Sequence, residues 1–310
     1  MDAHLRDLRY FVAVADELNF TRAAERLHLS QPALSKQIRG LETTLRAQLF
    51  QRDRRQVKLT AAGTVLHAVA RQLLDEWDDA TAAVADAAAE EARLLRVGTL
   101  TSIGRELYPA IIDHFAKCQP GWHIELRSFT WGDPTAGLRD QASDAAFVWL
   151  PIDTADVDFE VLATERRFVA ISTRHPLADR RAIEFTEIIN EPFAALPASA
   201  GPLRDFWLAT DQRAGKPPRV AAEVTSADEI FEIVSSGTAV TLLAEGNAIV
   251  YSRPGITCIP VHGLEPARLA VAWRRNDRRP AVQAFVGACR DAAAEPPGQF
   301  AQSGARRPIR

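Results

Sequence analysis

Residues 24–42, AERLHLSQPALSKQIRGLE, carry two leucine-rich helical patterns separated by the triplet Ser30, Gln31 and Pro32. Ser30 is a suitable N-cap for the second helix, and Pro32 is tolerated in the first turn because N–H groups there lack an intrahelical acceptor. This helix should bury one apolar stripe and leave polar and cationic side chains outward. It is either half of an ordinary helical hairpin or a helix presented to a partner. The expected buried positions are Ala33, Leu34, Ile38, Leu41 and Leu45, and the expected outward positions are Gln31, Ser35, Lys36 and Arg39.

The residues around this segment predict a small helical domain that ends in a β-hairpin. Apolar positions within residues 5–18 follow a helical period, and Thr21 is the expected N-cap of a short helix through His28. Residues 48–60, QLFQRDRRQVKLT, contain two short strand patterns joined by a basic connection. The arginines expected at the tip of this hairpin are Arg52, Arg54 and Arg55.

A long helix is expected after this domain. Thr60 is its predicted N-cap, and residues 61–91 repeat apolar residues at spacings of three and four. A helix of roughly 30 residues would be about 45 Å long, too long and one-sided to be buried in one small domain. The pattern therefore predicts a seam for a partner helix. Its positions are Leu66, Val69, Leu73, Trp77, Ala80, Val84 and Ala87.

From Leu94 onward, strand patterns alternate with helical patterns. Short apolar runs typical of buried strands alternate with helical patterns over about 200 residues, which predicts an α/β architecture. Residues 292–310 have no periodicity and are expected to be disordered. The expected strands lie in RLLRVGTL, HIELRSF, AAFVWLP, RRFVAIS, TCIPV and RLAVAWR.

Composition places the chain among ordinary globular proteins of two or three domains. It has 310 residues, of which 47% are hydrophobic and 25% charged, and no secretory signal or apolar run suggests a membrane segment. Three isolated cysteines predict neither a disulfide framework nor a zinc site, so a reducing cytoplasm is expected. Residues 1–60 hold 11 Lys and Arg against 7 Asp and Glu, although the whole chain has a net charge of -3. This segregation favours a polyanionic partner for the first domain.

Residues 19–63 resemble the N-terminal domain of LysR-type transcriptional regulators. The resemblance rests on AAERLHLSQPALSKQIRGLE, the following Leu-Phe pair and KLTAAG, all at the family's spacing, and on TRHPLADRR further along. It extends to about residue 290. It implies a multidomain fold: a winged helix-turn-helix at 1–60, a dimerising linker helix at 61–91, and a two-lobed α/β effector domain like a periplasmic binding protein at 92–291. Lobe I would comprise 92–163 and 266–291, and lobe II 164–265.

The resemblance implies that the second helix of the first domain enters the major groove with its N-terminus first. Glutamine can pair with adenine, lysine favours guanine acceptors, and proline can contact a thymine methyl group. Lys36 stands where arginine is frequent in the family. The hairpin arginines suit the phosphate backbone or the minor groove. The expected DNA contacts are Gln31, Pro32, Ser35, Lys36, Arg39, Arg52, Arg54 and Arg55.

Effector domains of the family bind a small molecule between their lobes. Exposed N–H groups where a strand meets a helix can hold an anion, and Ser102 is expected to cap such a helix. A tryptophan in the polar loop at 128–135 favours a pocket wall. These features predict a carboxylate-type effector. The positions that the family uses for effector contact, together with a fourth strand-to-helix junction at Thr225, give the expected contacts Thr101, Ser102, Thr130, Trp131, Pro197, Ser199 and Thr225. Arg105 and Arg204 are possible anion clamps that more naturally lie on helix surfaces.

Three other functions compete with ligand-responsive transcription control. An enzyme is disfavoured, because the chain lacks the common nucleophile, phosphate-binding, dinucleotide and zinc-protease motifs. A thiol redox sensor would need reactive cysteines, whereas Cys258 lies in an apolar strand. A purely architectural DNA-binding protein would not need a two-lobed domain. No cofactor or metal is expected, and the expected partners are promoter DNA, the effector, a second copy in a homodimer or homotetramer, and RNA polymerase.

Overall fold

The computed structural model describes residues 4–52, 57–103, 107–153 and 155–295. The chain divides into two compact units, Met1–Ala88 and Ala89–Arg310. Arg54, Arg55 and Arg105 lie outside the described residues, as do the side chain of Arg52 and most of the tail expected to be disordered. None of the helices in the described ranges is long and apolar enough to cross a membrane.

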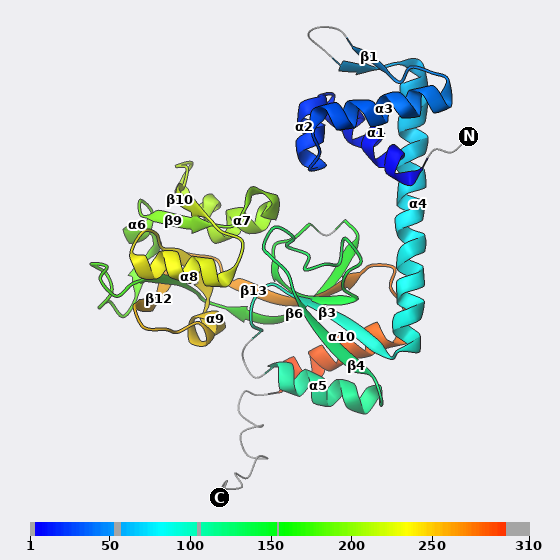
Figure 1. The fold of residues 1–310 in the computed structure, drawn as a ribbon. Coiled ribbons are helices and arrows are strands. Elements are labelled where there is room, and N and C mark those ends of the chain that lie inside the picture. The colour runs from blue at the N-terminus through cyan, green and yellow to red at the C-terminus, as the bar shows by residue number, and fades with distance from the viewer. Residues whose placement is uncertain (1–3, 53–56, 104–106, 154, 296–310) are drawn as a thin grey trace, which may run out of the picture. The chain divides into compact units, whose positions relative to one another are not determined.

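The described part of the first unit contains three helices, a β-hairpin and most of a long fourth helix (Figure 1). The hairpin strands pair antiparallel, with Phe50 opposite Leu59. The elements are α1 (Leu5–Glu17), α2 (Phe20–Arg26), α3 (Gln31–Leu45), β1 (Phe50–Arg52), β2 (Val57–Leu59) and α4 (Ala61–Glu91).

Side-chain caps fix where these helices begin. The Ser30 hydroxyl accepts the N–H of Ala33 at 3.4 Å, and the Thr60 hydroxyl accepts the N–H of Gly63 at 2.9 Å, so both expected caps are confirmed. The expectation for Thr21 is wrong. Asn19 caps α2 instead, because its carboxamide oxygen accepts the N–H groups of Thr21 and Arg22. Asparagine is at least as good an N-cap as threonine, and it precedes Thr21 in the chain.

The helices of the first unit enclose an aromatic core. The ring of Phe50 lies 5.4 Å from that of Phe11 and 5.6 Å from that of Phe20. On α3, the expected stripe is buried at Leu34, Ile38 and Leu41, and Leu45 is partly buried. Two expectations are wrong, since Ala33 is exposed and Ser35 is buried.

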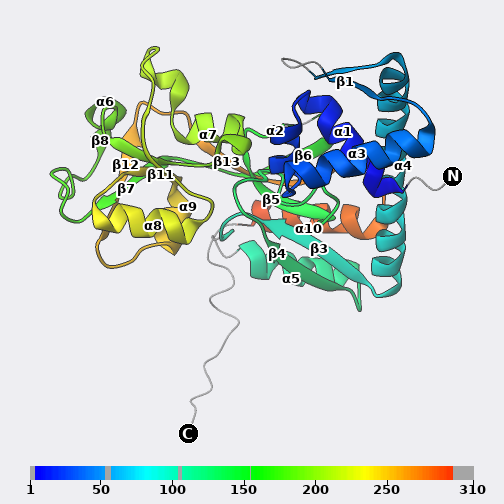
Figure 2. The ribbon, with the colours of Figure 1, turned by 45° about the horizontal axis from the view of Figure 1, so that its top comes forward.

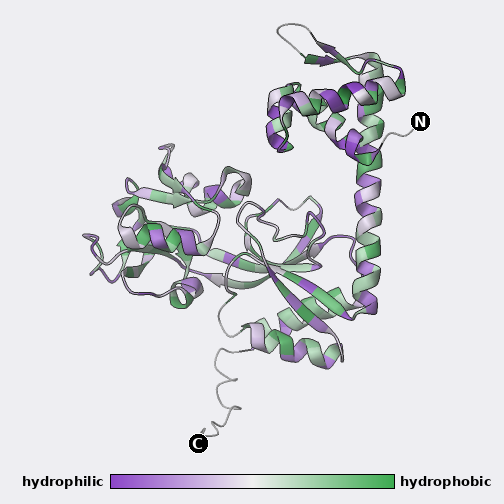
Figure 3. Ribbon diagram, in the orientation of Figure 1, coloured by the Kyte–Doolittle hydropathy of each residue, from purple (hydrophilic) through white to green (hydrophobic). Residues whose placement is uncertain are grey.

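Helix α4 is packed on one side and leaves an apolar face uncovered. Ala70 is fully buried in the core of the first unit, and Asp16 of α1 pairs with Arg71 of α4 at 2.5 Å. Val69, Leu73 and Trp77 are nonetheless between 44% and 48% exposed, and apolar residues recur along the helix (Figure 3).

The second unit contains two main sheets. The five-stranded sheet has the order β4-β3-β5-β13-β6, and helices α5 and α10 lie side by side against it (Figures 1 and 2). Phe285 of α10 joins them, with its ring 5.8 Å from Phe115 of α5 and 5.9 Å from Phe147 of β5. The elements are β3 (Leu94–Thr99), α5 (Leu107–Cys118), β4 (His123–Ser128), β5 (Ala145–Leu150), β6 (Val157–Glu165), β13 (Ala267–Arg274) and α10 (Pro280–Ala294).

The other sheet has the order β11-β7-β12-β8, and a parallel pair, β9 and β10, lies beside it. All six expected strand segments are therefore strands. The remaining elements are β7 (Arg167–Ser172), β8 (Ile183–Glu184), α6 (Phe185–Ile188), β9 (Pro192–Ala195), η1 (Ala198–Ala200), α7 (Pro202–Trp207), η2 (Thr210–Arg213), β10 (Arg219–Glu223), α8 (Ala227–Ser236), β11 (Thr241–Ala244), α9 (Glu245–Val250) and β12 (Ile256–His262).

A buried arginine lies where the chain crosses between the sheets. The crossings are at residues 165–167 and 262–267. The guanidinium of Arg167 donates to the backbone oxygen of Glu265 at 2.9 Å and to that of Phe206 at 2.6 Å. Burial lowers the pKa of Arg167 to about 10, so the group stays charged at neutral pH. It therefore ties the second crossing to the C-terminal end of α7.

A second charged cluster stabilises the five-stranded sheet. The carboxylate of Asp144 is fully buried and accepts hydrogen bonds from the guanidinium groups of Arg96 and Arg279, each with a bond of 2.7 Å. Burial alone would raise the pKa of Asp144, but these hydrogen bonds outweigh it and the pKa is lowered.

Candidate functional site

The N-terminal half of α3 presents an organised polar surface. Gln31, Pro32, Lys36 and Arg39 are exposed, as expected. Ser35 is buried instead, and its hydroxyl accepts a hydrogen bond of 2.9 Å from the side-chain amide of Gln31. Its backbone oxygen also accepts a bond of 3.2 Å from the Nε of Arg39. Ser35 thus orients two exposed side chains rather than facing outward itself.

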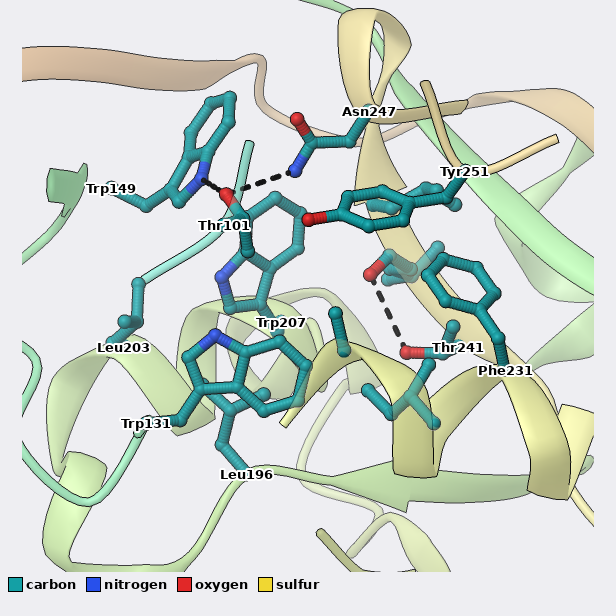
Figure 4. A pocket seen from close by; sticks show the side chains of 14 residues that line it. Thr101, Trp131, Trp149, Leu196, Leu203, Trp207, Phe231, Thr241, Asn247 and Tyr251 are labelled. Atoms are coloured by element: carbon teal, nitrogen blue, oxygen red, sulfur yellow. Dashed lines mark hydrogen bonds between the residues drawn. The ribbon is translucent and has the colours of Figure 1, made fainter. Parts of the chain in front are cut away.

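The second unit contains an aromatic cavity of about 500 Å³, counting the space at its open mouth. Figure 4 shows rings on several sides of it. Trp149 and Trp207 pack edge to face, with their centroids 5.8 Å apart. The aromatic lining residues are Trp131, Trp149, Trp207, Phe231 and Tyr251, the polar ones are Thr101, Thr241 and Asn247, and the aliphatic ones are Leu196, Leu203, Ala227, Ile230, Leu242 and Leu243.

Thr101 is the polar centre of the aromatic cavity. Its hydroxyl oxygen accepts hydrogen bonds from the indole N–H of Trp149 at 3.2 Å and from the amide of Asn247 at 3.4 Å (Figure 4). Trp149 belongs to the five-stranded sheet, whereas Asn247 lies on α9. The carboxamide oxygen of Asn247 is buried and has no hydrogen-bond partner among the described residues. The cavity therefore holds an unsatisfied acceptor beside its centre, which generally carries a free-energy cost.

A second, more polar cavity adjoins the first. It measures about 1000 Å³ including its open part, and shares Thr101, Ala227 and Tyr251 with the aromatic cavity. Ser102 lines it, and the backbone N–H of Ser102 donates to the phenol oxygen of Tyr251 at 2.8 Å. Its other lining residues are Thr99, Leu100, Ile103, Tyr108, Leu126, Ser128, Phe129, Ser226 and Asp228.

No basic side chain lines either cavity within the residues that the structure describes. Arg204, one possible anion clamp, donates instead to the backbone oxygen of Leu196 and to the carboxylate of Glu223. An anion here would depend on hydroxyl, indole, side-chain amide and backbone N–H donors.

The expected effector contacts divide into two groups. Thr101 and Trp131 line the aromatic cavity, and Thr101 and Ser102 line the polar one. Thr225 is occupied elsewhere, since its N–H donates to the carboxylate of Glu229 at 2.6 Å. This bond is the first cause of the lowered pKa of Glu229. Thr130, Pro197, Ser199 and Thr225 are absent from the described lining of both cavities.

Several lining residues were not anticipated from the sequence: Trp149, Trp207, Phe231, Thr241, Asn247 and Tyr251. The available signal was the unusual position of two of them. Trp149 is the penultimate residue of a fully buried strand, and Asn247 is a buried polar residue on the helix that follows another buried strand. A large or polar group at such a position is a reasonable pocket candidate.

The three cysteines are free, and their environments differ. Cys118 is exposed, Cys258 is partly buried and Cys289 is buried. Burial raises the pKa of Cys258 to about 11 and raises that of Cys289 well above its usual value. Both thiols therefore stay protonated at neutral pH, which disfavours reaction with oxidants. The described residues include no cluster of side chains able to hold a metal ion.

Two family models match the chain. Residues 88–294 match the LysR substrate binding domain, and residues 5–64 match the model described as "Bacterial regulatory helix-turn-helix protein, lysR family". The Hca operon transcriptional activator HcaR of Escherichia coli (strain K12) is 32% identical over 284 residues, which cover 91% of this chain and 95% of HcaR. AlsR of Bacillus subtilis (strain 168), an HTH-type transcriptional regulator, is 28% identical, covering 91% of this chain and 94% of AlsR.

Solved structures also align along most of the chain. Full-length BenM aligns with a TM-score of 0.53 and 26% identity over 96% of this chain and 100% of that chain. Full-length CbnR complexed with its target DNA aligns with a TM-score of 0.50 over 94% of this chain and 100% of that chain. At 23% identity the CbnR likeness concerns the fold alone.

Proposed function

Because the chain belongs to the LysR family of transcriptional regulators, we propose that it reads promoter DNA through α3 and responds to an aromatic carboxylate bound between its two lobes. The family consists of regulators rather than enzymes, and it combines a helix-turn-helix domain with an effector-binding domain. The proposal concerns the DNA contacts, the effector class and the assembly.

The proposal for the effector rests on the adjoining aromatic and polar cavities. An aromatic ring suits the aromatic cavity, whose described lining includes five aromatic side chains. A carboxylate suits the polar cavity, where Ser128 and Ser226 offer hydroxyl groups. Ala227 and Asp228, in the first turn of α8, add N–H groups that have no intrahelical acceptor. Thr101, Ser102 and Trp131 are the proposed contacts, and Thr130, Pro197, Ser199 and Thr225 would join them only if the lobes closed further.

A thermal-shift series can test the effector class. Benzoate should raise the unfolding temperature more than acetate, which lacks the ring, or benzyl alcohol, which lacks the charge. Trp131→Ala should remove most of the benzoate effect, whereas Trp122→Phe, outside the described lining of both cavities, should retain it. Equal responses to all three compounds, or an unchanged response in Trp131→Ala, would exclude the proposed site.

The proposed DNA surface is the exposed N-terminal half of α3. Gln31, Pro32 and Lys36 would reach base edges and nearby phosphates, with Ser35 supporting Gln31, and Arg39 would contact the backbone. Arg52, Arg54 and Arg55 are proposed as wing contacts on sequence grounds. Binding should weaken with salt because lysine and arginine contacts release counterions from DNA.

Fluorescence anisotropy on the DNA upstream of its own gene can test this surface. Lys36→Ala should weaken binding and reduce the salt slope by about 1 if the side chain contacts a phosphate. Gln37→Ala is the matched control, since Gln37 is also exposed on α3 but lies about 100° round the helix. Salt-insensitive binding, or equal effects of the two substitutions, would argue against α3 as the reading helix.

The proposed assembly is a homodimer or homotetramer in the cytoplasm, where promoter DNA lies. Pairing through the apolar face of α4 would place two copies of α3 on the half-sites of an inverted repeat. Effector binding would then shift the equilibrium between arrangements of the assembly and change its contact with RNA polymerase. Such a shift requires that the effector bind one arrangement more tightly than the other.

A further inference from the structure

Tyr251 links the two lobes at the boundary between the cavities. It follows α9, and its ring stacks on Phe231 with a centroid distance of 5.1 Å and an interplanar angle of 25°. Its phenol oxygen accepts the N–H of Ser102, a residue that follows strand β3 of the other lobe, at 2.8 Å. Figure 4 shows the ring with its oxygen directed toward the Thr101 side of the aromatic cavity.

The bond to Tyr251 occupies a donor that an anionic effector would need. Ser102 and Tyr251 both line the polar cavity, and the described lining holds no basic side chain that could replace the Ser102 N–H. A carboxylate oxygen is a stronger acceptor than a neutral phenol, because charge-assisted hydrogen bonds are roughly twice as strong as neutral ones. A carboxylate entering the polar cavity would therefore compete with Tyr251 for this N–H.

Helix α9 connects Tyr251 to the crossing between the sheets. At the start of α9, the N–H of Glu245 donates to the backbone oxygen of Arg166 at 3.1 Å. The N–H of Gly246 donates to the carboxylate of Glu165 at 2.9 Å, and Arg166 and Glu245 also form an ion pair. A displacement of Tyr251 at one end of α9 would thus act on residues of the crossing at the other.

We propose that Tyr251 is a specificity-determining residue: its phenol oxygen holds the Ser102 N–H in the unliganded protein and yields it to the acceptor atom of the effector. This inference rests on the effector class proposed above. A ligand that lacks an acceptor can fill the aromatic cavity but leaves the Tyr251–Ser102 bond in place. A carboxylate breaks that bond and releases Tyr251 from Ser102, while Asn247 of α9 keeps its hydrogen bond to Thr101.

Tyr251→Phe tests this role because it removes the oxygen and keeps the stacking ring. Tyr108→Phe is the matched control, since Tyr108 also lines the polar cavity. In the ligand-free protein, hydrogen–deuterium exchange of residues 100–103 should be faster in Tyr251→Phe than in the wild type or in Tyr108→Phe. Equal exchange in all three proteins would overturn the proposal, and this readout does not depend on any ligand.

Calorimetric titration provides the second readout. Benzoate should bind Tyr251→Phe about two- to tenfold more tightly than the wild type, the range expected when one neutral hydrogen bond no longer competes. Toluene, which has no acceptor, should bind both proteins equally. Unchanged or weaker benzoate binding in Tyr251→Phe would overturn the proposal. If benzoate binds neither protein while exchange responds as expected, the effector class fails and the Tyr251–Ser102 bond stands.

Discussion

The side-chain amide of Gln31 lies 2.9 Å from the hydroxyl of Ser35 and donates a hydrogen bond to it. Gln31 is exposed and Ser35 is buried, so the bond runs from the surface of α3 to its packed side. A flexible glutamine loses rotamer freedom when it binds, and a bond that holds it beforehand reduces that loss. The proposed reading residue is therefore oriented before it meets DNA.

The first prediction concerns this pair. Gln31→Ala should weaken binding to the preferred operator by about 1–3 kcal/mol, the range for a lost base contact. Ser35→Ala should cost roughly 1 kcal/mol, because it removes only the orienting bond. The double variant should lose less binding free energy than the sum of the two single losses. Fluorescence anisotropy across a double-mutant cycle measures this difference. Strictly additive losses would mean that Ser35 does not orient Gln31.

The second prediction concerns association through α4. Glutamate at Leu73 or Trp77 places a charge on the exposed apolar face of the helix and should shift the chain toward monomer. Sedimentation over a concentration series measures this shift. Ala68→Glu introduces the same charge at another exposed position of α4 and should leave the assembly intact. A monomeric wild type, or equal effects at all three positions, would exclude this face as the interface.

The third prediction concerns Asp144. Asp144→Asn leaves Arg96 and Arg279 without their buried carboxylate and should destabilise the effector domain by roughly 3–5 kcal/mol near pH 7. The folded pKa of Asp144 is lowered, so its contribution is complete above the unfolded pKa of about 4 and is lost as the pH falls through the folded value. Urea unfolding from pH 7 downward should show the difference from wild type narrowing below about pH 4. The exposed Asp291→Asn variant should show no such pattern.

The fourth prediction concerns the thiols. An aromatic disulfide reagent at pH 8 should react quickly with Cys118 alone, since Cys258 and Cys289 have raised pKa values and restricted access. Denaturation should expose all three thiols, and Cys118→Ser should abolish the fast phase. Fast reaction of a second thiol, together with peroxide-sensitive DNA binding, would restore the redox-sensor interpretation.

Local sequence patterns predict most of the fold. The Ser30 and Thr60 caps, the hairpin and the alternating strands depend on neighbours in the chain, and these are readable from sequence. Ser35 could not be read in this way, because it lies at the edge of the apolar stripe and its burial depends on packing between helices. The Asn19 cap is not predicted because two nearby polar residues, Asn19 and Thr21, are both suitable for one cap position.

The cavities were less predictable for a physical reason. Thr101 and Trp131 could be nominated because the family resemblance places effector contacts in loops that follow strands, where α/β sheets commonly bind ligands. Trp149, Trp207 and Tyr251 come from separate elements, and only the packing of two lobes brings them together. The Tyr251–Ser102 bond joins residues 149 positions apart, which no local pattern encodes.

The buried guanidinium of Arg167 has a consequence for how the lobes can move. It holds the crossing at Glu265 and the carbonyl end of α7, the helix that carries Trp207 into the cavity wall. A rotation of one lobe about the crossings must therefore move Trp207 as well, or break a hydrogen bond of the buried Arg167 guanidinium. The angle between the lobes and the shape of the aromatic cavity are then coupled, and a ligand bound in this cavity would select both at once.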